Sequence, residues 1–382
     1  MQLVAYGAQD VYLSGNPQIT FFKVVYRRHT NFSMESIEQT FNGTVAAGNK
    51  VTATISRNGD LIHRCYVQMK VSAATDGTGT DKGTAKNAEN VGHAALAEVE
   101  VEIGGQRIDK HYSQWLDVWA DLTVPKGKTD GYDIMVSSGD TLYVPLQFWF
   151  CRNPGLALPL IALQYHEVKV NITFAAATAI GTGGAAGTDG AAGANASITS
   201  ASLWVDYIYL DTDERRRFAQ VSHEYLIEQL QFTGVEKAKS NGSHRLNFNH
   251  PVKELVWVNN APSDAVTNWN AHVAVGDCKL QLNGHDRMAA RDGSYFSLVQ
   301  PYQHHTNVPA DSSASSNINV YSFALKPEDH QPSGTCNMSR IDNATLHVAA
   351  SATGKDKDLY IFAVNYNVLR IMGGMGGLAY SN

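Results

Sequence analysis

The chain has 382 residues, of which 43% are hydrophobic and only 17% are charged, and its formal net charge is −6. Charged residues usually make up about a quarter of a protein, so the deficit suggests that much of the surface is buried against other subunits. The acidic balance argues against a general nucleic-acid binder, and the 6 Trp, 17 Tyr and 13 Phe exclude a disordered chain.

The sequence also argues against membrane-spanning and secreted classes. No apolar run reaches the roughly 18 residues that a spanning helix needs. Residues 1–4 lack the basic start and apolar stretch of a signal peptide, so we expect none. The four cysteines, at positions 65, 151, 278 and 336, form no CxxC pair. Reduced thiols in a cytosolic setting are therefore expected, rather than a disulfide framework or a zinc site.

Apolar and polar residues alternate along most of the chain, which predicts β-strands because successive side chains of a strand point to opposite faces. In chain order the predicted strands lie at 51–55, 65–71, 98–103, 168–174, 203–209, 255–258, 279–282, 344–348 and 359–368. Many short strands bounded by Gly, Asn, Asp and Pro are typical of a sandwich or a barrel.

Helical signals are few. Residues 113–122 place Leu116 and Trp119 three positions apart, with Trp115 on the same face, and residues 213–218 could form one polar turn. Neither segment is long enough to define a helical domain.

Two low-complexity stretches, 75–87 and 175–197, lie between predicted strands and indicate surface loops. The glycine-rich segments 77–83 and 181–187 lack the GK[ST] of a phosphate loop, and 181–187 has no helix after it, so flexible loops are favoured. The polar segment 211–217 is a better candidate for a domain boundary, since a second β-rich run begins after Gly234.

The two halves of the chain resemble each other. Residues 103–108 and 282–288 each have a strand end, a glycine turn, an arginine and an apolar residue. Residues 148–150 match 321–323, and 168–174 match 344–348. We interpret this as a duplicated β-domain. The alternative is that two β-rich domains share turn chemistry by chance.

The chain offers little enzyme chemistry. His304 and His305 are adjacent, and neighbours on a strand point to opposite faces, while His63 and Cys65 have no partners nearby in the sequence. No GxSxG elbow is present. We predict no catalytic, cofactor-binding or metal-binding residue and no cofactor.

Two charged clusters allow alternative interpretations. Residues 215–217 are three arginines preceded by Asp211, Asp213 and Glu214. They indicate a locally neutralised polar turn, or less readily a contact with phosphate or an acidic partner. Lys23, Arg27, Arg28 and His29 lie among Phe21, Phe22, Tyr26 and Phe32. This mixture fits an arm that touches lipid or a partner subunit, or a solvated edge strand.

Long strings of the sequence closely resemble the major capsid proteins of large nucleocytoplasmic DNA viruses, especially those of algal viruses. The resemblance covers the whole chain and is carried by residues 3–23 (LVAYGAQDVYLSGNPQITFFK), 26–32, 144–150, 153–163, 209–219, 283–284, 323–327 and 337–340, together with Arg287, Tyr302 and Gly334. It implies an all-β double jelly roll: two consecutive eight-stranded antiparallel sandwiches with few short helices. The implied domains are an N-terminal arm (1–24), a first jelly roll (25–212), a linker (213–222) and a second jelly roll (223–382).

The resemblance implies a structural virion protein and not an enzyme. Its homotrimers would form pseudo-hexagonal capsomers that tile an icosahedral capsid over an internal membrane, after assembly in the host cytoplasm. The implied partners are other copies of the chain, minor capsid proteins and, through the arm, the viral membrane, with no direct nucleic-acid contact. The rival functions are a minor capsid paralogue, a carbohydrate-binding attachment protein and a metal-dependent jelly-roll enzyme.

Overall fold

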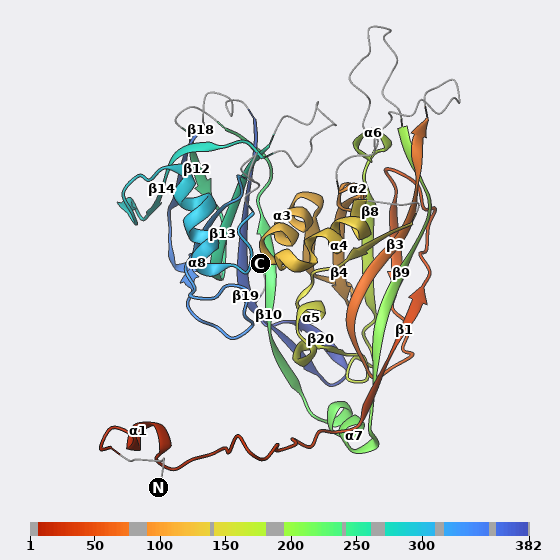
Figure 1. The fold of residues 1–382 in the computed structure, drawn as a ribbon. Coiled ribbons are helices and arrows are strands. Elements are labelled where there is room, and N and C mark those ends of the chain that lie inside the picture. Colours follow the sequence, from red (N-terminus) through yellow and green to blue (C-terminus); the bar gives the residue numbers. More distant parts are fainter. Residues whose placement is uncertain are drawn as a thin grey trace.

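The computed structural model describes residues 7–75, 90–137, 141–180, 195–238, 242–260, 272–309, 317–350 and 357–380. Two β-rich halves stand side by side, and α7 (Thr212–Gln220) connects them at one end of the molecule (Figure 1). Residues 7–31 leave the body as an arm next to α7, with one short helix, α1 (Val11–Ser14).

The first half consists of two antiparallel sheets. One has the strand order β1-β9-β3-β6, with the short β7 paired to β3, and the other has the order β2-β8-β4-β5. The strands are β1 Phe32–Gln39, β2 Lys50–Thr54, β3 Leu61–Thr75, β4 Leu96–Ile103, β5 Gln106–Tyr112, β6 Thr141–Pro145, β7 Leu158–Pro159, β8 Val168–Phe174 and β9 Asn195–Leu210.

The second half repeats this arrangement. Its sheets have the orders β10-β19-β13-β16 and β12-β18-β14-β15, and the short β11, β17 and β20 pair with the first of them. The strands are β10 His223–Phe232, β11 Glu236–Lys237, β12 Gly242–Leu246, β13 Pro251–Asn260, β14 Val275–Leu282, β15 His285–Asp286, β16 Asn319–Ser322, β17 Cys336–Asn337, β18 Ala344–Ala350, β19 Asp358–Met372 and β20 Met375–Leu378.

The two halves have one topology. Without the short extra strands, each half has eight strands, and in both halves the chain-order sequence across the sheets is 1-8-3-6 and 2-7-4-5. Two such four-stranded sheets form a jelly roll. The predicted fold, two consecutive eight-stranded antiparallel jelly rolls, is confirmed, and the shared topology agrees with the predicted duplication.

The hairpin turns show the duplication in detail. The β4–β5 turn holds Gly104 and Gly105 at φ 58° and 85°, and the β14–β15 turn holds Asn283 and Gly284 at φ 52° and 78°. Two successive positive φ values define the tight turn that suits the twist of a hairpin. The predicted match of 148–150 with 321–323 is looser, because the first segment enters a helix and the second ends a strand.

The helices are few and short, as predicted. Besides α1 and α7, the described residues contain α2 Val91–Ala95, α3 Ser113–Thr123, α4 Lys126–Ser137, α5 Trp149–Arg152, α6 Ala177–Ile180 and α8 Gln300–His304, with a π turn η3 (Tyr295–Val299) and the 3₁₀ turns η1 (Pro154–Leu156) and η4 (Met338–Arg340). The sequence pattern did not predict α4, because it contains two glycines and buries only Val136.

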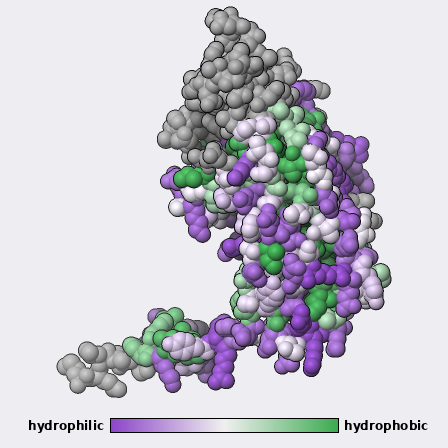
Figure 2. Space-filling model, turned by 90° about the vertical axis from the view of Figure 1, so that its right-hand side faces the viewer, coloured by the Kyte–Doolittle hydropathy of each residue, from purple (hydrophilic) through white to green (hydrophobic). Residues whose placement is uncertain are grey.

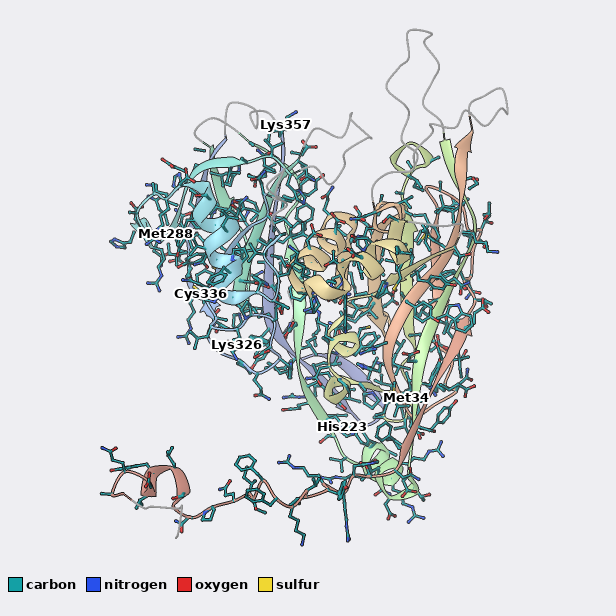
Figure 3. The ribbon with its side chains drawn as sticks, in the orientation of Figure 1. Met34, His223, Met288, Lys326, Cys336 and Lys357 are labelled. Atoms are coloured by element: carbon teal, nitrogen blue, oxygen red, sulfur yellow. The ribbon has the colours of Figure 1, made fainter. Side chains whose placement is uncertain are left out.

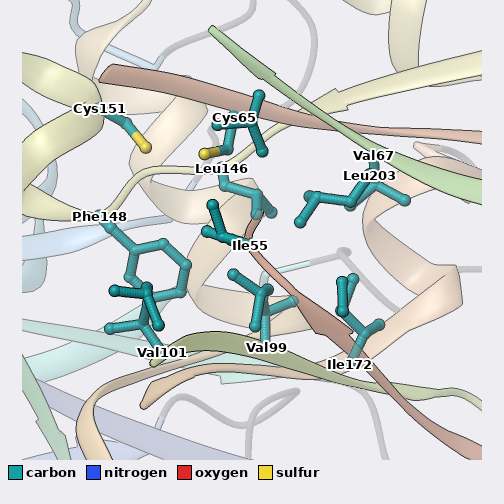
Figure 4. Close-up of a cluster of buried hydrophobic side chains, with 14 of the residues drawn as sticks. Ile55, Cys65, Val67, Val99, Val101, Leu146, Phe148, Cys151, Ile172 and Leu203 are labelled. Atoms are coloured by element: carbon teal, nitrogen blue, oxygen red, sulfur yellow. The ribbon is translucent and has the colours of Figure 1, made fainter. Parts of the chain in front are cut away.

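Each half has its own core, made from the inward-facing residues of both sheets. In the first core Ile55, Val67, Val99 and Leu203 pack together from four segments (Figure 4). The second core is built around Trp257 and includes Leu280, Leu346 and Ile361. The glycine-rich segments 77–83 and 181–187 lie outside the described residues.

Candidate assembly surfaces

Helix α3 joins the two halves. It belongs to the first half, between β5 and β6, but its Trp115 and Trp119 pack against the sheet β10-β19-β13-β16 of the second half. There they meet Val256, Phe362 and other apolar residues on the face of this sheet that points away from its own core. The outer face of the sheet β10-β19-β13-β16 is therefore buried inside the chain.

The sequence placed the apolar residues of α3 on one face, and the structure corrects this. Leu116 packs into the first core, whereas Trp115, Val118, Trp119 and Leu122 contact the second half. A helix held between two halves is apolar on both sides, so a single amphipathic stripe was the wrong expectation.

Buried charges cross the same junction. The guanidinium of Arg152, on α5, lies 2.7 Å from a carboxylate oxygen of Glu228, on β10. The ammonium of Lys253 lies 2.8 Å from the other oxygen of Glu228 and is fully buried. Burial lowers the pKa of Lys253 despite Glu228 and Glu254 nearby. Arg152 also stacks over the ring of Trp119 at 4.1 Å. Since removal of one partner from a buried ion pair is costly, these contacts fix how the halves meet.

A second charged group, centred on His305, lies next to Lys253 and Glu228. The ring of His305 is buried between Glu254, at 3.0 Å, and Glu328, at 2.9 Å. Burial opposes the charge on His305, but the two carboxylates prevail and raise its pKa to about 9. The adjacent histidines that the sequence singled out are thus at the end of α8, not on a strand, and His305 holds the loop around Glu328.

The outer face of the sheet β1-β9-β3-β6 contrasts with that of β10-β19-β13-β16, because no element among the described residues covers it as α3 covers the other. Tyr66 and Trp204 stack there with ring centroids 6.2 Å apart, and Tyr143 lies beside them. Arg64 and Asp206 flank these rings on the same strands. Figure 2 looks onto this side of the molecule, where polar residues surround separate apolar patches.

A groove of about 820 Å³ runs from this face to the junction between the halves. Its lining includes Tyr66 and Tyr143 from the open face, and Trp119, Arg152 and Glu328 from the junction. Aromatic and arginine side chains in a partly polar recess are typical of protein–protein contact sites. Sequence reasoning missed this surface. The available signal was the aromatic residue at the outward positions 66 and 204 of two predicted strands.

The arm carries the most exposed apolar residues of the described chain. Phe22 is 98% exposed, and the arm's other exposed apolar side chains are Val11, Tyr12, Leu13, Ile19, Phe21, Val24, Val25 and Tyr26. Lys23, Arg27 and Arg28 are exposed among them. These residues form no strand, so the edge strand begins only with Phe32. Met34 and His223 lie near the arm's root at the α7 end (Figure 3).

The three arginines of α7 form a polar helix rather than a single turn. Asp211 caps the helix through its side chain, and the first turn contains Asp213 and Glu214. Arg215, however, pairs with Asp60 of the first half at 2.8 Å. The neutralising group is therefore distant in sequence, which no local pattern could predict.

His63 and the cysteines, which the sequence analysis also considered, lie in ordinary structural environments. The ring of His63 is buried and lies 2.6 Å from the carbonyl oxygen of Phe150. The sulfurs of Cys65 and Cys151 point toward one another in the first core (Figure 4). This thiol neighbour, together with burial, raises the pKa of Cys65 well above its usual value. All four cysteines are free thiols.

Two features are absent from the described residues. No three histidine, cysteine or acidic side chains among them are placed to hold a metal ion. No helix in this part of the chain is long and apolar enough to cross a membrane.

Family models match nearly the whole chain. The model for the N-terminal part of major capsid proteins matches residues 20–211, and the model for large eukaryotic DNA virus major capsid proteins matches residues 214–377. The chain is 59% identical to the major capsid protein of Pyramimonas orientalis virus and 47% identical to that of Paramecium bursaria Chlorella virus 1, with 100% of this chain and 99% of each relative covered.

Solved structures give the same result. The capsid protein VP54 of the Chlorella virus PBCV-1, fitted into a reconstruction of the virophage Sputnik, is 43% identical to this chain, with a TM-score of 0.80 and coverage of 95% of this chain and 100% of that one. The Faustovirus major capsid protein, at 13% identity and a TM-score of 0.74 over 96% of this chain and 95% of its own, shares the fold. These relatives are structural proteins, not enzymes. The doubled jelly roll and the full-length similarity lead to one conclusion: the chain belongs to the major capsid proteins of large eukaryotic DNA viruses, which form the shell of the virion.

Proposed function

We propose that three copies of this capsid protein close into a capsomer with a pseudo-hexagonal outline, which tiles an icosahedral shell over an internal membrane. The proposal rests mainly on the repeated module: each chain supplies two jelly rolls of one topology, so three chains supply six. A PBCV-1 capsid model that contains a chain 42% identical to this one supports the proposal.

The contacts should be of two kinds. The trimer contact should be an obligate interface that buries more than about 2,000 Å² and is apolar at its centre. Contacts between capsomers should be smaller, more polar and individually weak, because weak contacts release misplaced capsomers while many together stabilise the shell. The low fraction of charged residues fits a chain that is surrounded by copies of itself.

Light scattering and negative-stain microscopy of the purified protein test this proposal. Three copies of the 41.6 kDa chain predict a particle of about 125 kDa with a hexagonal outline. A stable monomer at micromolar concentration would overturn the trimer.

We further propose that the arm lies on the inward face of the shell, against the membrane or minor capsid proteins. Exposed aromatic residues next to Lys23, Arg27 and Arg28 support this, since such segments bind at the boundary between lipid headgroups and acyl chains. Deletion of residues 1–24 should leave the trimers intact but impair shell assembly. Loss of the trimer would contradict this placement.

The remaining parts of the proposal are the expectations that the sequence already raised. The proposed domains are the arm (1–24), the jelly rolls (25–212 and 223–382) and the linker (213–222), although the extended chain of the arm continues to residue 31, just before β1. Assembly takes place in the host cytoplasm, which the four free thiols support. The net charge of −6 supports the absence of direct nucleic-acid contact.

A further inference from the structure

The four cysteines of the chain have surroundings of two kinds. Cys278 is buried in the second half, and its thiol donates to the carbonyl oxygen of Gly276 at 3.5 Å. Cys336 is half-buried on the short strand β17. Cys65 and Cys151 instead face a second thiol, because their sulfurs point toward one another in the first core (Figure 4). A core cysteine that only fills space needs no such neighbour, so this pair calls for an explanation.

Two hydrogen bonds hold together the segments that carry the pair. Cys65 lies on β3, and its carbonyl oxygen accepts the backbone N–H of Leu146 at 2.9 Å. Nearby on β3, the ring of His63 lies 2.6 Å from the carbonyl oxygen of Phe150, the residue before Cys151 on α5. A disulfide requires Cα atoms about 4.4–6.8 Å apart. Because the hydrogen bonds already keep β3 and α5 together beside the sulfurs, a bond between the sulfurs needs little movement of the chain.

A small molecule can reach the pair from outside. Both cysteines line the groove of about 820 Å³ that runs from the open face to the junction. Cys151 is 9% exposed and Cys65 only 2%. The thiolate is the reactive form of cysteine, and the neighbouring thiol and burial raise the pKa of Cys65, so Cys65 stays protonated. Cys151 is therefore the thiol that meets an oxidant first.

We propose that Cys65 and Cys151 form a disulfide when a peroxide reaches the groove, and that this bond fastens α5 to β3. With hydrogen peroxide, the Cys151 sulfur attacks one oxygen, the O–O bond breaks, and Cys151 becomes a sulfenic acid as water leaves. The Cys65 sulfur then attacks the sulfenic sulfur, the S–O bond breaks, and a second water leaves with the Cys65 proton. Two thiols lose two electrons in total, and one peroxide is reduced to two waters.

The bond would act on the junction between the halves. Arg152 follows Cys151 directly on α5 and pairs with Glu228 of the second half at 2.7 Å. A cross-link at Cys151 therefore holds in place the segment that anchors one half to the other. In a reducing cytosol the pair stays as thiols, and the bond forms only where an oxidant is present. The inference goes beyond the proposed capsomer and does not depend on it.

Peptide mapping of the full chain tests the bond. The Cys336→Ser variant, which removes the most accessible thiol, is reduced, exposed to hydrogen peroxide, unfolded in the presence of N-ethylmaleimide and digested without reductant. We expect a cross-linked peptide pair that joins Cys65 to Cys151 and disappears on reduction with dithiothreitol. Maleimide-blocked thiols at both positions, or a sulfinic acid at Cys151 beside a free Cys65, would overturn the proposal.

Thermal unfolding tests the fastening. A disulfide between residues 65 and 151 restricts a long segment of the unfolded chain, so oxidation should raise the midpoint of the Cys336→Ser protein by about 5 °C or more. The matched control, Cys151→Ala in the same background, should show no such rise. Because the oxidised and reduced samples share one sequence, their comparison stands even if the control folds poorly. A disulfide without a rise in the midpoint would overturn the fastening.

Discussion

The outer faces of the two sheets β1-β9-β3-β6 and β10-β19-β13-β16 have the same place in their jelly rolls but opposite surroundings. A row across the second sheet reads Phe232, Phe362, Val256 and Val320, and all four contribute to the cluster under α3. A row across the first sheet reads Glu38, Trp204, Tyr66 and Pro145, and water reaches all of them.

The difference shows how one topology serves two situations. A face that is always covered can be wholly apolar, because it never contacts water in the folded chain. A face that water reaches combines aromatic side chains with polar neighbours, as Tyr66 and Trp204 do beside Arg64 and Asp206. The two halves share one topology, and the side chains of each outer face differ according to whether α3 covers that face.

The largest expected effect comes from truncating one residue in each row. Phe362→Ala should lower the free energy of unfolding by about 3–5 kcal/mol, because it leaves a cavity under α3. Trp204→Ala should cost only about 1–2 kcal/mol of the chain's own folding stability, since Trp204 is partly exposed and loses mainly its stacking on Tyr66. Urea denaturation of both variants measures the difference, and equal losses would contradict it.

The second effect depends on pH and concerns the ion pairs of His305 with Glu254 and Glu328. The pKa of His305 is raised from 6.5 to about 9 in the folded state, so its charge stabilises the fold fully below pH 6.5. This stabilisation, on the order of 3 kcal/mol, should be lost as the pH rises through 9. Thermal unfolding from pH 6 to 10 should show the decline in the wild type but not in His305→Gln. Parallel curves for the two proteins would disprove this role.

The third and smallest effect compares the hairpin turns. Gly104 and Asn283 have equivalent positions, with φ values of 58° and 52°. A Cβ at Gly104 would lie 2.2 Å from the ring of His166. Gly104→Asn should therefore cost about 2 kcal/mol through overpacking, although asparagine is the native residue in the second turn. The control Asn283→Gly should change the thermal midpoint little, and a harmless Gly104→Asn would show that His166 moves aside.

Much of the fold was predictable because it depends on local alternation. Every strand predicted from the period of two is present, and the glycine turns located the duplication. The helix α4 was not predictable, since only Val136 of its residues is buried and its glycines obscure any helical period. The π turn η3 was also missed, because five residues with i→i+5 bonding are too short to leave a period in the sequence.

The contacts at the candidate assembly surfaces were harder to predict from the sequence. Arg152 and Glu228 are 76 positions apart, and Arg215 pairs with Asp60 across 155 positions. Such pairs are set by how the halves meet, which no local pattern encodes. The arm was the exception, since its mixture of aromatic and basic residues was visible in the sequence and remains uncovered in the structure.

The helix α4 gives the two modules different outlines, because the described residues between β15 and β16 contain only η3 and α8 in its place. In a closed ring of three chains, α4 would be present in every second module. Such a tile looks unchanged after a third of a turn but not after a sixth. Each tile would therefore have two distinguishable orientations in a hexagonal array, and adjoining tiles must agree on theirs for their borders to match.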